Sequence, residues 1–104
     1  MQNDRILRLL GLCRRAGKLL SGQDTVITAV RSEKAALALL SSDASERTQK
    51  QLRDKCAFYG VPLLHLTVDG DSLGKATGKS GTLSSLAVTD RGFASAIRKL
   101  AEED

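Results

Sequence analysis

The apolar run AALALL at residues 35–40 constrains the fold most, because it leaves no polar face for solvent. Polar residues flank the run on both sides. A short continuous run of this kind is typical of a strand buried on both faces, although its composition alone would also suit a helix. Its brevity favours the strand. A strand buried on both faces requires packed layers on both sides of its sheet.

Segments with helical spacing surround this strand. Residues 2–17 have the pattern of an amphipathic, basic helix, and residues 71–77 that of a short helix. Capping patterns predict three further helix starts. The capping residues are Ser21 with Asp24, Asp43 with Glu46, and Asp90.

Three more strands are predicted, at residues 18–20, 63–68 and 83–88. Strands and helices thus alternate along the chain, which predicts a mostly parallel sheet between two layers of helices. A length of 104 residues suffices for one domain with one modest core. We therefore expect residues 1–104 to form a single α/β domain.

The distribution of charge favours a polyanionic partner. The formal net charge is +4, although the last three residues are all acidic. No acid lies between Asp4 and Asp24, whereas five cations do. These cations are Arg5, Arg8, Arg14, Arg15 and Lys18. The alternative is a solvated basic surface without a specific partner.

Several other classes of protein are not indicated. Cys13 and Cys56 have no paired spacing and His65 is the single histidine, so we expect no zinc site and no disulfide, and two reduced, buried thiols. No apolar run approaches the ~20 residues of a membrane span, so we expect a soluble, cytoplasmic protein. No nucleophile is paired with a base, so we expect neither catalysis nor a cofactor.

The segment GKATGKSG at residues 74–81 resembles the phosphate-binding loop of an ATPase but lacks its spacing. That loop has four residues between its first glycine and Gly-Lys-Ser. Only three residues separate Gly74 from Gly78. A true loop also follows a strand and opens a helix, whereas this segment ends a predicted helix. ATP hydrolysis is therefore not predicted.

Two segments combine backbone freedom with hydrogen-bonding side chains. At residues 22–25, GQDT, a helix start offers unpaired N–H groups to an anion, and Gly22 lets a phosphate approach closely. At residues 79–82, KSGT, small residues surround a lysine in a loop suited to phosphate or sugar contact. Each segment alone is also what an ordinary helix cap or surface turn uses.

The aromatic residues argue against recognition by base stacking. Phe58, Tyr59 and Phe93 are the only ones, and their helical spacing favours the core. Binding to nucleic acid would then depend on backbone, shape and charge, and would weaken steeply with salt.

The order of four segments resembles a known family. GKLLSGQDTVITAV is followed by LALLSSDAS, then DKCAFYGVPLLHL, then SLGKATGK. In this order and spacing they resemble the YlxQ-type bacterial proteins, members of the ribosomal-protein superfamily typified by the archaeal kink-turn binder L7Ae. The resemblance runs from about residue 9 to residue 100.

The resemblance implies a three-layer α/β/α sandwich with a four-stranded mixed sheet, and a non-enzymatic role in binding structured RNA, either ribosomal or kink-turn-like. In that family the start of the second helix and the loop after the fourth contact the RNA. The residues at matching positions are Lys18, Gly22, Gln23, Asp24, Thr25, Thr28, Lys79, Ser80, Gly81 and Thr82.

The chain departs from the kink-turn pattern at Asp24, Thr25 and Thr28, and in the last loop, where lysine and small polar residues replace the usual apolar ones. Kink-turn binders carry asparagine, glutamate and lysine where this chain has Asp24, Thr25 and Thr28. An ionised aspartate offers acceptors only, whereas asparagine offers a donor as well. The alternative function is a protein-interaction adaptor on the same fold, whose basic first helix docks an acidic partner.

Overall fold

Helices and strands alternate along the chain, as the sequence predicts. The computed structural model describes residues 3–79 and 81–102. The helices are α1 (Asn3–Arg15), α2 (Gln23–Arg31), α3 (Glu46–Tyr59), α4 (Gly70–Ala76) and α5 (Arg91–Glu102). The strands are β1 (Leu19–Ser21), β2 (Leu37–Leu40), β3 (Leu63–His65) and β4 (Ser85–Val88). Within these described residues no helix has the length and hydrophobicity that crossing a bilayer requires.

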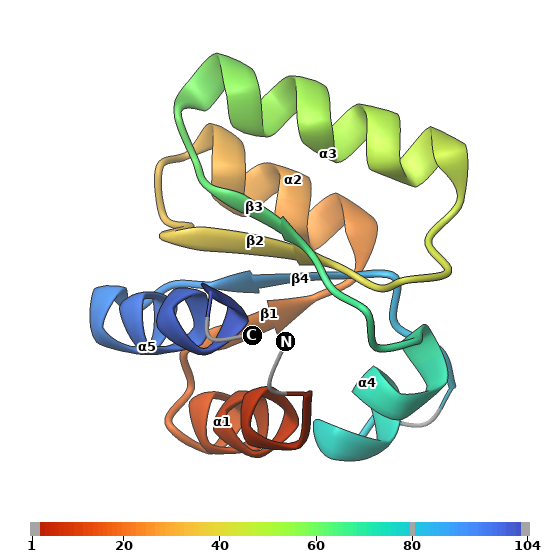
Figure 1. The fold of residues 1–104 in the computed structure, drawn as a ribbon. Coiled ribbons are helices and arrows are strands. Elements are labelled where there is room, and N and C mark those ends of the chain that lie inside the picture. The colour runs from red at the N-terminus through yellow and green to blue at the C-terminus, as the bar shows by residue number, and fades with distance from the viewer. Residues whose placement is uncertain (1–2, 80, 103–104) are drawn as a thin grey trace.

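The four strands form one mixed sheet in the order β1-β4-β2-β3. β2 and β3 are parallel, whereas β4 runs antiparallel to both of its neighbours. The mixed sheet is thus confirmed, and the expectation of mostly parallel pairing is wrong. α2 and α3 each carry the chain back along the sheet to the end at which the next strand starts. The short α4 instead lies beyond the end at which β3 stops (Figure 1). The chain therefore enters β4 from that same end and runs in the opposite direction.

Helices cover both faces of the sheet, as a three-layer sandwich requires (Figure 1). α2 and α3 lie on one face, and α1, α4 and α5 on the other. β2 serves both sides: Leu37 and Leu39 pack toward α1 and α5, whereas Leu40 packs toward α2 and α3. All four residues of β2 are buried. The strand predicted from the AALALL run is therefore confirmed, including its burial on both faces.

Two of the three predicted helix caps are wrong. Ser21 belongs to β1, and α2 begins after Gly22, whose φ of 97° turns the chain from strand to helix without a side-chain cap. At α3 the capping residue is Ser45, which accepts a hydrogen bond from the Thr48 N–H at 3.1 Å. Asp43 lies outside that helix, and its carboxylate accepts from the Gly70 N–H at 2.9 Å. Its partner is distant in sequence, so the local pattern could not reveal it.

The third cap is confirmed at the start of α5. The Asp90 carboxylate accepts a hydrogen bond from the Phe93 N–H at 2.9 Å. A side-chain acceptor at this position satisfies one of the amide groups that a helix start leaves unpaired.

One aromatic residue is not in the core. Phe58 has 80% of its surface exposed, contrary to the prediction, while Tyr59 and Phe93 are partly buried. The buried residues of α3 are Thr48, Leu52 and Cys56, which are four positions apart. Phe58 follows Cys56 by two positions and so projects from another side of the helix.

Both cysteines are buried free thiols, as predicted. Cys13 on α1 donates a hydrogen bond from Sγ to the Lys18 carbonyl oxygen at 3.3 Å. Burial, and after it the negative charge of Asp90, raises the pKa of the Cys13 thiol to about 11. Burial also raises the pKa of Cys56.

Candidate nucleic-acid interface

The turn between β1 and α2 exposes the start of α2. Gly22 adopts a φ of 97°, which favours glycine. The Gly22 carbonyl accepts the first helical hydrogen bond, from the Val26 N–H at 2.9 Å. No side chain caps this helix start. The first amide groups of α2 therefore remain available to an external anion, at the positive end of the helix dipole.

The loop between α4 and β4 is held against α4 by two glycines. A Cβ atom on Gly74 would lie 2.2 Å from the Gly81 carbonyl oxygen, and one on Gly70 would lie 2.4 Å from a methyl carbon of Thr82. The Lys79 N–H donates to the Gly74 carbonyl at 2.8 Å. These contacts allow the loop to pack directly on the backbone of the helix and set the position of Lys79.

The geometry of this loop also explains why it is no phosphate-binding loop of the ATPase type. The N–H groups of Thr77, Gly78 and Lys79 all donate to carbonyl oxygens of α4. A P-loop needs such N–H groups free to surround phosphates. These three N–H groups are therefore not available to an anion, whereas the side chain of Lys79 is exposed.

The two segments converge on one hollow of about 320 Å³. Thr25 from the first turn of α2 and Lys79 from the α4–β4 loop both line it. Its other lining residues are Arg14, Leu19, Leu20, Ser21 and Thr77. We call this hollow the cleft. Among these residues two are cations and none is acidic.

A second hollow of about 370 Å³ lies along the exposed side of α2. Asp24, Thr28 and Lys34 line it, and it shares Leu20 and Thr25 with the cleft. Asp24, Thr25 and Thr28 of α2 therefore face one continuous surface, with Thr25 at its centre.

Two other predicted positions, Gln23 and Lys18, have different surroundings. Gln23 is turned toward α3, where its Oε1 accepts from the Thr48 hydroxyl at 3.2 Å and its amide nitrogen donates to Gln51 Oε1. Lys18 lies at the other end of β1, ~13 Å from Gly22 for a strand of this length. Its carbonyl oxygen accepts from the Thr89 N–H at 2.9 Å.

The remaining predicted positions belong to the loop. Gly81 and Thr82 are exposed. The backbone of Gly81 packs against Gly74 of α4, and the methyl group of Thr82 packs against Gly70. Ser80, also predicted to contact RNA, lies outside the described residues.

Arg14 in the cleft was not among the predicted site residues. Its guanidinium lies against the α4–β4 loop, because a Cβ atom on Gly78 would be 3.3 Å from one of its nitrogens. The basic charge of the first helix was recognisable in the sequence. Only the packing of α1 against α4 shows which of its arginines reaches the cleft.

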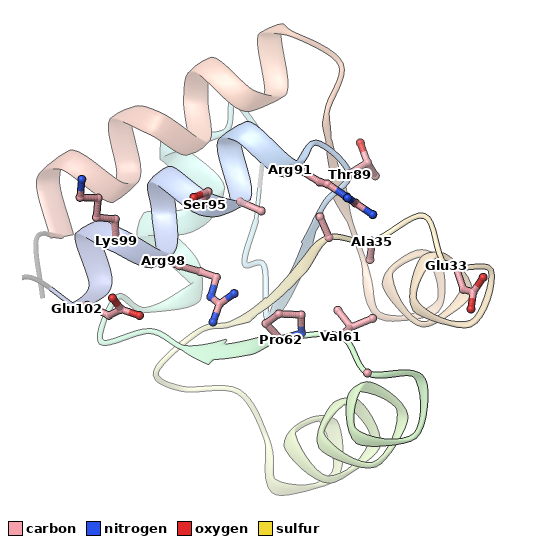
Figure 2. Close-up of a pocket in the computed structure, with 13 residues that line it drawn as sticks. Glu33, Ala35, Val61, Pro62, Thr89, Arg91, Ser95, Arg98, Lys99 and Glu102 are labelled. Atoms are coloured by element: carbon pink, nitrogen blue, oxygen red, sulfur yellow. The ribbon is translucent and has the colours of Figure 1, made fainter.

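A larger hollow lies elsewhere, with a volume of about 740 Å³ (Figure 2). Arg91, Ser95 and Arg98 of α5 face Ala35 and Pro62 across it. Ala35 and Pro62 precede β2 and β3, so this hollow is at the opposite end of the sheet from the cleft. None of the predicted site residues lines it. The described residues also contain no cluster of three potential metal ligands.

Comparison with known proteins identifies relatives over nearly the whole chain. RNA-binding protein YlxQ of Bacillus subtilis is 44% identical over 93 residues, which are 88% of this chain and 90% of the relative. RNA-binding protein YlxQ of Enterococcus faecium is 35% identical over 96 residues, which are 92% of this chain and 90% of the relative.

Solved structures with the same fold include a protein of unknown function from Bacillus halodurans and the 15.5kD RNA-binding protein of Giardia lamblia. The first has a TM-score of 0.88 and 39% identity, and the match covers 94% of this chain and 97% of that one. The second has a TM-score of 0.77 and 17% identity, and the match covers 95% of this chain and 83% of that one. Residues 4–98 match the profile of the ribosomal protein L7Ae/L30e/S12e/Gadd45 family. The chain therefore belongs to this family.

Proposed function

We propose that this protein is a non-enzymatic, cytoplasmic RNA-binding protein that recognises structured RNA, ribosomal or kink-turn-like, through the cleft. The observation that carries the proposal is that Thr25 at the start of α2 and Lys79 of the α4–β4 loop line one hollow without an acidic residue. The RNA-binding function named for both YlxQ relatives supports it.

The chemistry of the cleft suits a phosphate backbone. Lys79 and Arg14 supply positive charge, and the uncapped start of α2 supplies N–H donors beside them. An arginine can bind two phosphate oxygens at once, whereas lysine acts as a point charge. Phosphate contacts of this kind place the RNA in the cleft.

The polar side chains of α2 recognise the bases. Thr25 and Thr28 are exposed, and their hydroxyls both donate and accept hydrogen bonds. Asp24 accepts only, so it selects N–H groups at base edges. Gly22, Gly81 and Thr82 complete the contact through backbone and small side chains. Gln23 acts by fastening α2 to α3, and Lys18 contributes charge from the far end of β1.

The test compares three RNAs: a hairpin with a kink-turn internal loop, the same hairpin fully base-paired, and total ribosomal RNA. Affinity is measured by filter binding over a range of salt concentrations. We expect the kink-turn hairpin and ribosomal RNA to bind more tightly than the paired hairpin. Failure to bind any of the three would overturn the proposal.

A variant distinguishes a specific phosphate contact at the cleft from a general effect of positive charge on RNA affinity. Lys79→Ala removes one phosphate partner, so the slope of log affinity against log salt should fall by about 0.7–0.9. Lys55→Ala is the matched control, because Lys55 is exposed on α3, away from the cleft. Equal effects of the two substitutions would remove Lys79 from the site.

The alternative function is a protein-interaction adaptor that uses the basic first helix. The exposure of Leu12, 49% of its surface, beside the arginines of α1 favours it. Affinity capture with and without nuclease distinguishes the two functions. Partners that are lost after nuclease treatment support RNA binding, and partners that persist support the adaptor.

A further inference from the structure

A groove between α1 and α4 continues the cleft. Its volume is about 510 Å³, and Arg14 and Thr77 line both the groove and the cleft. Gly11 and Ala76 are among its small lining residues, and a Cβ atom on Gly11 would lie 3.2 Å from the Ala76 carbonyl oxygen. We call this surface the α1–α4 groove. The two helices approach closely at Gly11, and longer side chains extend on either side of that contact.

The longer side chains of the α1–α4 groove are basic. Arg8, Arg15 and Lys75 line it together with Arg14. None of the described residues that line it is acidic. Lys75 pairs with Asp71 on α4 at 3.3 Å, an exposed pair of little strength. The three arginines form no ion pair with any residue in 3–79 or 81–102.

The cations of the groove extend the charge of the cleft along α1. Arg8 and Arg15 are seven positions apart, which is ~10 Å along a helix. Arg14 stands between this pair and Lys79, since it lines both hollows. A path of cations without acids along it is what the phosphate backbone of one nucleic-acid strand requires.

We propose that the α1–α4 groove binds the sugar-phosphate backbone of the RNA strand that leaves the cleft, with Arg8 and Arg15 as its phosphate contacts. This inference rests on the proposed function, because the cleft must hold the structured part of the RNA. The groove contains no aromatic residue, so it binds without base stacking and reads no sequence.

An RNA strand fits the groove better than an acidic protein does. Protein interfaces depend on apolar or aromatic anchors in desolvated pockets. Leu7, which is partly buried, and Leu12 are the large apolar side chains among the described residues that line the groove, and no aromatic anchor accompanies them. The continuity with the cleft through Arg14 and Thr77 also favours one ligand that passes through both.

The test uses two kink-turn hairpins, one with short arms and one with each arm lengthened by a helical turn. The variant is Arg8→Ala/Arg15→Ala. Its charge-matched control is Arg91→Ala/Arg98→Ala, which removes two arginines from the hollow at the opposite end of the sheet (Figure 2). Circular dichroism and a thermal melt establish that both variants fold.

We expect wild-type protein to bind the long hairpin more tightly than the short one. Arg8→Ala/Arg15→Ala should lower the salt slope for the long hairpin by about 1.4–1.8, two phosphate contacts, and remove most of the advantage of the longer arms. The α5 control should preserve that advantage.

Other outcomes overturn the inference in distinguishable ways. If the long and short hairpins bind equally well, the groove is not used, while the proposed function stands. If both double variants have the same effect, the groove contributes only general charge. If neither hairpin binds, both the binding of kink-turn RNA and the proposed role of the groove are rejected. A nuclease-resistant protein partner lost only in Arg8→Ala/Arg15→Ala would assign the groove to protein.

Discussion

The resemblance to kink-turn binders predicts that Thr28 stands where those proteins carry a lysine, and its side chain is exposed beside Thr25. A lysine there would add a cation one helical turn beyond Asp24 without disturbing the core. We expect Thr28→Lys to tighten binding to the kink-turn hairpin and to increase the salt slope by about 0.7–0.9. Filter binding over a salt series measures both changes.

Ala57→Lys is the control for Thr28→Lys, because Ala57 is exposed on α3, away from the cleft. It adds the same charge, and we expect it to change affinity less. Equal gains from the two substitutions would show that net charge alone controls binding.

Cys13 makes stability depend on pH in the alkaline range. Its pKa is about 11 in the folded protein, compared with an ordinary value of 9.0. Below 9.0 both the folded and the unfolded chain keep this proton. Between 9.0 and about 11 the unfolded chain releases it and the folded chain does not, so the free energy of unfolding should fall as pH rises.

Urea unfolding at a series of alkaline pH values checks the effect of Cys13. Cys13→Ala should have a shallower decline than wild type, with a remaining contribution from Cys56, whose pKa burial also raises. Comparison of slopes, rather than absolute stabilities, allows for the small cavity that the substitution leaves. Identical slopes would show that Cys13 does not govern this pH dependence.

The packing of the α4–β4 loop on α4 gives a prediction at the scale of one element. A Cβ atom at Gly74 would lie 2.2 Å from the Gly81 carbonyl oxygen, so Gly74→Ala must displace the loop. The displacement moves Lys79 out of the cleft and costs about 1–3 kcal/mol of stability. We expect weaker binding to the kink-turn hairpin and a lower melting temperature, measured by filter binding and calorimetry.

Gly92→Ala is the matched control on α5. The nearest atom to its Cβ would be the Asp90 carboxylate oxygen that caps α5, at 3.1 Å, so this substitution disturbs a helix start far from the cleft. RNA affinity should stay close to that of wild type. If Gly74→Ala also leaves affinity unchanged while lowering stability, the loop does not position the binding residues.

Several features with a local signal could be predicted, although the local Ser45 cap of α3 was missed, and features that depend on distant partners could not. The run at residues 35–40 identified β2 because burial on both faces excludes polar residues. The Asp90 cap was also predictable, since its hydrogen bond spans three residues. The direction of β4 depends on where α4 ends, and Asp43 binds Gly70 rather than its own helix. Neither the direction of β4 nor the partner of Asp43 can be predicted from the adjoining sequence.

The residues of the candidate site also differ in whether the sequence could predict them. Residues 22–25 and Lys79 could be identified from local residue types and from the resemblance, and Thr25 and Lys79 do line one hollow. Arg14 was missed because α1 reaches the cleft only through its contact with α4. Gln23 has a suitable position in sequence, but its side chain is bonded to α3.

At the scale of the whole molecule, the two ends of the sheet differ in charge. The cleft and the α1–α4 groove contain only cations among their charged lining residues, and the adjoining hollow along α2 adds Asp24 and Lys34. At the other end, Arg91, Arg98 and Lys99 share the large hollow with Glu33 and Glu102. The acids lower the positive potential there. A polyanion should therefore approach the molecule at the end that bears the cleft.

Hydrogen exchange with and without the kink-turn hairpin tests this polarity directly. A bound RNA excludes solvent from the uncapped start of α2 and restrains the α4–β4 loop, so we expect slower exchange at residues 22–28, 74–79 and 81–83. Residues 91–102 of α5 should exchange at the same rate with and without RNA. Lys79→Ala should reduce the protection at the same RNA concentration, because it weakens binding. Protection confined to α5 would place the RNA at the opposite end of the sheet and would reject the cleft as its binding site.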